Sequence, residues 1–175
     1  MTTDQTVRGP WLTARIGLVL GVCFAICCAT GMLSHWIQHP PEWFWWPAHP
    51  AWLYRITQGA HVITGVASIP LLLAKLAAVY PKLFERPLIG SPARLLERLS
   101  IAVLVSAAIF EVLTGIMNIA QWYPWRFFFT TTHHAMAFVV IGALLVHIAV
   151  KLPVIREALD RGGPIRDTAV VDEDA

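Results

Sequence analysis

Seven histidines are the residues of this chain best suited to bind a metal or move a proton, and five lie in or beside long apolar segments. Ionisable side chains are costly in hydrocarbon, so a histidine there is a candidate functional group. His133 and His147 lie in one such segment. On an α-helix their spacing falls about 40° short of four full turns, so both rings face nearly the same way, about 21 Å apart along the axis. One helix can offer axial ligands to two stacked haems in this geometry.

A haem with two axial histidines needs a second ring at the same depth on another helix. The stretch of chain from His61 to Tyr80 is nearly as long as the stretch from His133 to Lys151. At the helical rise per residue, both histidines are roughly 27–29 Å from the inner boundary of their segments. His134 has nearly the same depth but points about 100° away from the face that His133 shares with His147. The sequence therefore predicts one b-type haem held by His61 and His133.

The support for a second haem is weaker. At the depth of His147 the other apolar segments offer no usual haem ligand, so one haem is favoured and two remain possible. His147 and His35 are candidates for a second haem or for contacts with a propionate or a quinone. Arg55 and Arg126 are candidate partners for the anionic propionates, and plain snorkelling at the membrane interface explains them equally well.

Other readings of the same polar residues stay open. A transmembrane histidine is often a satisfied polar group or an interhelical hydrogen-bond donor. A metal-ion site is less favoured, because no carboxylate or thiolate lies within a turn of His61 or His133 to complete a zinc shell. Glu111 could relay protons to a quinone, accept a hydrogen bond from a ligand histidine, or lie protonated inside the bundle. Gly31 and Gly115 are small residues at comparable depth that would leave room for a flat macrocycle or for close helix contact.

The amino-acid composition distinguishes a membrane protein from a soluble one. The chain has 175 residues, of which 57% are hydrophobic and 14% are charged, and its mean hydropathy is +0.60. An average soluble domain carries about 25% charged residues, so a soluble fold is excluded. The net charge of +2 is too small for nucleic-acid binding. A protein of the lipid bilayer remains.

Four apolar segments predict the elements that position the histidines. The expected transmembrane helices cover residues 12–35, 52–79, 98–120 and 128–151, and each is long enough to cross the hydrocarbon core of a bilayer. Short connections imply an all-α, up-down four-helix bundle. One membrane domain covers 1–158, and the polar tail 159–175 is expected to be disordered. No internal repeat is apparent.

Charges and tryptophans give the expected orientation. Eleven of the 13 lysines and arginines lie at one end of the segments, which places both termini in the cytoplasm by the positive-inside rule. Seven of the eight tryptophans mark the other end as an aromatic belt, and the loop 39–50 carries three of them. We therefore expect a multi-pass protein of the cytoplasmic membrane.

Several stretches resemble a known family. They are similar to membrane-integral b-type cytochromes of the cytochrome b561 and respiratory-dehydrogenase anchor class, and most closely to the actinobacterial membrane domain associated with sulfite-oxidase-like molybdopterin oxidoreductases. The similar stretches are 52–61, 69–83, 96–100, 118–125 and 141–153.

The resemblance implies an electron-transfer subunit without a catalytic pocket of its own. Electrons would pass between the membrane quinone pool and an extracytoplasmic molybdopterin enzyme. His61 and His133 would be the haem ligands, His147 the inner histidine and His35 the outer first-span histidine. The inner first-span histidine that a two-haem arrangement requires is absent.

Two alternatives belong to other classes. The chain could be a haem-free membrane anchor that interacts with quinone. It could also be a small transporter or structural membrane protein whose histidines form a proton path.

Overall fold

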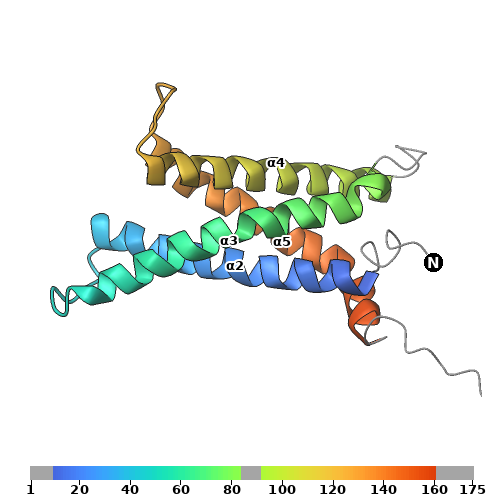
Figure 1. Ribbon diagram of the computed structural model, residues 1–175, viewed down its shortest axis with the longest axis horizontal. Coiled ribbons are helices and arrows are strands. Elements are labelled where there is room, and N and C mark those ends of the chain that lie inside the picture. Colours follow the sequence, from blue (N-terminus) through green and yellow to red (C-terminus); the bar gives the residue numbers. More distant parts are fainter. Residues whose placement is uncertain (1–9, 84–91, 161–175) are drawn as a thin grey trace, which may run out of the picture.

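The computed structural model describes residues 10–83 and 92–160, and every regular element in them is an α-helix. Figure 1 shows the four helices, which are α2 (Pro10–Gln38), α3 (Trp52–Leu83), α4 (Pro92–Ala120) and α5 (Phe129–Asp160). All four are long and apolar enough to cross a membrane. The all-α, four-helix prediction is therefore confirmed, and the chain has the character of a multi-pass membrane protein.

The helices extend beyond the predicted apolar segments. α4 begins at Pro92 rather than near residue 98, and α5 continues to Asp160 rather than ending near residue 151. Helices of these lengths measure about 45 Å, which exceeds the hydrocarbon thickness of about 30 Å. The added turns carry charged residues such as Arg94, Glu97 and Arg156. The predicted tail 159–175 lies outside the described residues from 161 onward.

The helices pair as two hairpins. α2 packs most extensively on α3, and α4 on α5; α2 also contacts α5, and α3 contacts α4 to a smaller extent. The connections that follow α2 and α4 lie at the same end of the molecule, on the left in Figure 1. A site formed between the hairpins near this end can take one side chain from each of them.

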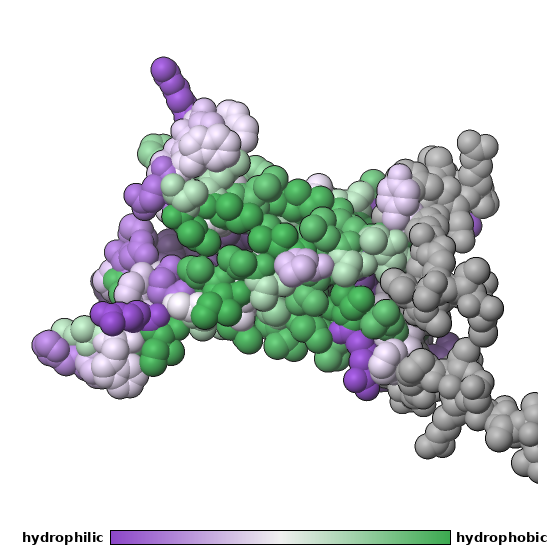
Figure 2. Space-filling view, viewed as in Figure 1, coloured by the Kyte–Doolittle hydropathy of each residue, from purple (hydrophilic) through white to green (hydrophobic). Residues whose placement is uncertain are grey.

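The interior is small and the surface is apolar. The main buried cluster contains Leu20, Phe24, Leu72, Ala107, Ala108 and Val140. Many large apolar side chains point outward instead, such as Ile63 at 69% and Leu145 at 63% exposure. Figure 2 shows these hydrophobic residues as a broad band across the middle of the molecule, with hydrophilic residues gathered at the end that carries the loops. Such a surface is compatible with contact to lipid.

Aromatic residues dominate the two connections at that end. Trp36 and Trp43 meet edge to face at 5.1 Å, while Trp43 and Trp45 remain 70% and 80% exposed. α4 ends in a Schellman-type turn, in which Gln121 has a φ of 54° and the Trp122 amide donates to the Met117 carbonyl at 3.0 Å. This turn ends α4 before the second aromatic connection begins.

Candidate functional site

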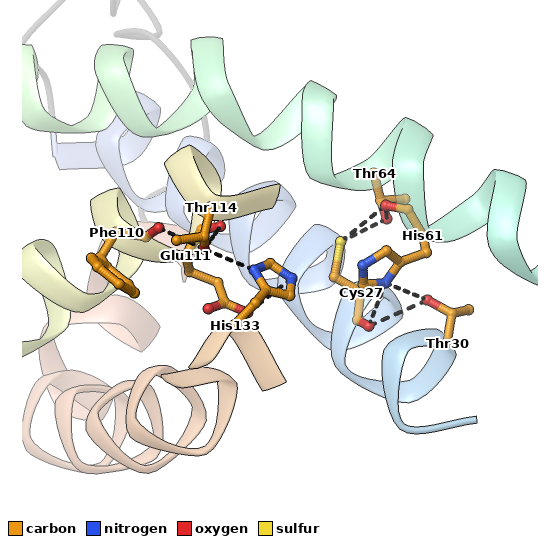
Figure 3. A network of polar contacts seen from close by, with 8 residues as sticks. All are labelled: Cys27, Thr30, His61, Thr64, Phe110, Glu111, Thr114 and His133. Atoms are coloured by element: carbon orange, nitrogen blue, oxygen red, sulfur yellow. Dashed lines mark hydrogen bonds and ion pairs between the residues drawn. The ribbon is translucent and has the colours of Figure 1, made fainter. Parts of the chain in front are cut away.

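The structure brings together His61 and His133, the two histidines that the sequence analysis pairs by their depth. The ring centres of His61 on α3 and His133 on α5 are 6.2 Å apart, and the ring planes are inclined at 81°. Figure 3 shows the two rings between the hairpins, with polar groups of α2 behind one and of α4 behind the other. Both side chains are half-buried. The predicted proximity of these residues is therefore present in the fold.

The imidazole of His61 is bound to α2. Its Nδ1 lies 3.0 Å from the carbonyl oxygen of Cys27 and 3.3 Å from Oγ1 of Thr30. A Cβ added at Gly31 would lie 3.0 Å from the ring carbon Cε1 and 3.3 Å from Nδ1. Glycine at this position lets the α2 backbone approach the ring closely, because an added Cβ would make the ring shift by a few tenths of an ångström.

The imidazole of His133 is bound to α4 in a similar way. Its Nδ1 lies 2.9 Å from Oγ1 of Thr114, which is 2% exposed. A Cβ added at Gly115 would lie 3.3 Å from Cε1 of the ring. The second ring nitrogen, Nε2, is 3.3 Å from a carboxyl oxygen of Glu111. Of the roles considered for Glu111, contact with a candidate ligand histidine is the one that this geometry supports.

Buried polar atoms without a hydrogen bond gather around the same site. Each of the four in the described part of the chain lies within about one helical turn of His61, Thr114 or His133 along its own helix: Gln58 Oε1, Glu111 Oε2, Asn118 Oδ1 and His134 Nε2. Buried polar groups are normally paired, so each exception needs an explanation. Three of these atoms belong to the helices that carry the histidine pair or back it, and His134 belongs to the outer cluster described next.

The outer histidines form a separate cluster. His35 stacks on His134 with ring centres 3.8 Å apart and planes inclined at 11°, and His39 lies 5.0 Å from His35. Two rings stacked face to face at this distance cannot serve as axial ligands on opposite sides of one iron. The structure thus places His35 beside His134 at the loop end, well separated along the bundle from the other candidate, His147.

His147 lies near the opposite end of the bundle among charged groups. Lys75, Lys151 and Glu97 act on it electrostatically, and Lys151 forms an ion pair with Glu97. The ammonium of Lys75 donates to the Thr13 carbonyl at 2.7 Å and so links α3 to α2. Among the described residues, no other histidine ring contacts His147.

The two candidate propionate partners remain at the surface. Arg55 lies on α3, nearly two helical turns before His61, and Arg126 lies in the connection between α4 and α5; both are exposed. Along the helix axis, Arg55 is about 9 Å from the level of His61. The structure does not bring either guanidinium to the histidine pair.

Sequence reasoning missed the hydroxyl and thiol groups behind the rings. Besides Thr30 and Thr114, the Cys27 thiol takes part, since its Sγ lies 3.0 Å from Oγ1 of Thr64 and 3.4 Å from the His61 carbonyl. One signal was available. A Thr–Gly dipeptide occurs in each of the first three apolar segments, at 30–31, 64–65 and 114–115.

No three-residue group of histidine, cysteine, aspartate or glutamate in residues 10–83 and 92–160 is placed to hold a metal ion.

No protein-family model, curated protein or solved structure matches this chain. The function therefore rests on the histidine pair and its surroundings.

Proposed function

We propose that the protein is a transmembrane electron carrier that binds one haem b between His61 and His133. The separation of the two rings carries this proposal. A histidine nitrogen binds a metal at about 2.0 Å, so one metal held by both residues would need their ring centres roughly 6 Å apart. The ring centres of His61 and His133 are 6.2 Å apart.

The ring nitrogens support the same assignment. In both rings Nδ1 is bonded to an oxygen of the neighbouring helix. Histidines that bind metals usually use the second nitrogen in this way, which fixes the orientation of the ring. Nε2 is then the nitrogen available to iron in each ring. The Glu111 carboxyl, which faces Nε2 of His133, would move aside when iron binds.

The surroundings suit a redox cofactor. When bound, the haem supplies a one-electron couple at its iron. The chain provides two axial nitrogens, close helix backbones at Gly31 and Gly115, and apolar helices that exclude water. The side-chain oxygens of Gln58 and Asn118 are buried without a hydrogen-bond partner, so they are available to a polar substituent of the ligand.

The proposed topology follows from the charges and the connections. Short connections and the two aromatic loops at one end support an up-down bundle with both termini in the cytoplasm. The histidine pair then lies in the outer half of the cytoplasmic membrane. Electrons would pass between the quinone pool and an extracytoplasmic molybdopterin oxidoreductase, and the stretches that resemble the membrane domain of such enzymes support that choice of partner.

Spectroscopy of the purified protein tests the proposal. In detergent, the reduced-minus-oxidised spectrum should show a sharp α band of b type, and pyridine haemochrome analysis should give one haem per chain. His61→Ala and His133→Ala should each abolish the band while the helical circular dichroism persists. A folded wild-type protein that stays colourless after haem is supplied would refute the proposal.

A further inference from the structure

The two hairpins contain the same ligand-holding unit. In each, a Thr–Gly dipeptide on the first helix faces a histidine on the second. The hydroxyl lies within 3.3 Å of the ring Nδ1, and the position of a glycine Cβ lies within 3.3 Å of the ring Cε1. The two units are Thr30–Gly31 with His61, and Thr114–Gly115 with His133. In each hairpin, therefore, one imidazole packs against a threonine hydroxyl and a glycine of the neighbouring helix.

In the first unit, the hydroxyl proton is already in use. Thr30 Oγ1 donates to the Ile26 carbonyl at 2.6 Å, so towards His61 it can only accept. The Cys27 carbonyl, 3.0 Å from the same Nδ1, can also only accept. Both contacts require the ring to carry its hydrogen on Nδ1. His61 is thus held in the tautomer whose Nε2 has a free lone pair.

The second unit leads to the same result. Thr114 Oγ1 donates its single proton to the carbonyls of Phe110 and Glu111, at 2.9 and 3.0 Å. Its remaining lone pair accepts the Nδ1–H of His133 at 2.9 Å. Because Thr114 is 2% exposed, water has little access to replace the hydroxyl. His133 therefore has the same tautomer as His61.

We propose that Thr30 and Thr114 are positioning residues that hold both imidazoles in the Nδ1–H tautomer. Nε2 of each ring is then unprotonated and would be available to the same iron once the Glu111 carboxyl, 3.3 Å from Nε2 of His133, moves aside. This assignment rests on the proposed haem and specifies how its two ligands are prepared. Neither threonine touches the iron. Each acts through its histidine, by setting which nitrogen carries the proton and how basic the other nitrogen is.

The two units differ in the groups that accept the Nδ1–H hydrogen bond, and this difference predicts which threonine variant has the larger effect. His61 keeps the Cys27 carbonyl as an acceptor if Thr30 loses its hydroxyl. For His133, the Thr114 hydroxyl is the one hydrogen-bond partner of Nδ1 among the described residues, and the backbone carbonyl of Glu111 acts on the same ring. Loss of an Nδ1–H acceptor makes the imidazole a weaker donor to iron, which disfavours the oxidised form and raises the midpoint potential. The shift should be larger for Thr114→Val than for Thr30→Val.

Valine replaces threonine at nearly the same volume, so Thr30→Val and Thr114→Val test the hydroxyls with little change in packing. Thr57→Val is the matched control on α3, because the Thr57 hydroxyl donates to the Tyr54 carbonyl and contacts no ring nitrogen. We expect higher midpoint potentials in both test variants, altered low-spin electron paramagnetic resonance spectra, and wild-type values in Thr57→Val. Thr114→Ser should restore the wild-type potential.

A second measurement needs no haem. Nitrogen-15 NMR of labelled histidine in the apo-protein should assign the Nδ1–H tautomer to His61 and His133, with that preference weakened for His133 in Thr114→Val. An Nε2–H tautomer in the wild type would overturn the inference, as would unchanged potentials and spectra in both valine variants that still bind haem. A wild type that binds no haem overturns the proposed function instead, and NMR then decides the tautomers alone.

Discussion

The rings of His61 and His133 lie 6.2 Å apart and nearly perpendicular to each other, although the two residues belong to different hairpins that are distant in the chain. Each is bonded through Nδ1 to the preceding helix of its own hairpin, α2 for His61 and α4 for His133. The relationship between the rings therefore depends on how the two hairpins meet. The contacts that hold His61 and those that hold His133 can therefore be altered by separate substitutions.

Replacing Gly31 by alanine should impair haem binding. The new Cβ would lie 3.0 Å from Cε1 of His61, closer than packing allows, and the ring is already bonded to the backbone of α2. Overpacking of this kind typically costs about 1–3 kcal/mol. We expect reduced haem content and a lower thermal unfolding midpoint, measured on purified protein.

Gly21→Ala is the matched control on the same helix, because a Cβ there would meet nothing within 4 Å. Alanine is a better helix former than glycine by about 1 kcal/mol, so this variant should be as stable as the wild type or more so. Equal haem content in Gly31→Ala and Gly21→Ala would contradict the close approach at Gly31.

Much of this arrangement can be predicted from the sequence, because a membrane relates position in the chain to depth. Apolar length gives the spans, and the distance of a histidine from the end of its span gives its depth. Depth, together with the helix face that His133 shares with His147, pairs His61 with His133, and the fold places their rings in proximity. The sequence predicts that Gly31 and Gly115 make room for a macrocycle or a helix; in the structure they lie against the imidazoles themselves.

The hydroxyl groups cannot be found in this way. A threonine that bonds back to its own helix looks the same in sequence whether or not a histidine of another helix also reaches it. A Thr–Gly dipeptide also occurs at 64–65, and those at 30–31 and 114–115 are farther apart in the chain than the two histidines are. The number of residues between the dipeptide and the histidine therefore differs between the two hairpins, so a search for sequence repeats does not detect their similarity. Only the packing of α2 on α3 and of α4 on α5 reveals it.

Replacing Glu111 by leucine should leave haem binding intact or strengthen it. Oε1 of Glu111 faces Nε2 of His133 at 3.3 Å, the nitrogen that iron would use, and Oε2 is buried without a partner. Removing the carboxyl removes both a competitor for Nε2 and an unpaired polar atom, which costs about 1–3 kcal/mol when buried. Titration of apo-protein with haem measures the affinity, and a loss of binding in Glu111→Leu would show that the carboxyl supports the site.

Replacing His147 by leucine should not change the haem content. His147 lies among Lys75, Lys151 and Glu97, and no second histidine contacts it in the described residues. Pyridine haemochrome analysis should therefore give one haem per chain in both the variant and the wild type. A ratio of two in the wild type that falls to one in His147→Leu would instead establish a second haem at this end of the bundle.

The ion pair between Lys151 on α5 and Glu97 on α4 should contribute little to stability. Its two side chains are 34% and 33% exposed, so solvent and salt screen their attraction. Pairs of this kind contribute about 0.2–1 kcal/mol. A double-mutant cycle with Lys151→Met and Glu97→Gln, followed by unfolding in detergent, should give a coupling energy in that range that declines as salt is added. A coupling several times larger and insensitive to salt would mean that the pair is shielded by lipid, and that the end of the bundle near His147 is embedded more deeply than its exposure indicates.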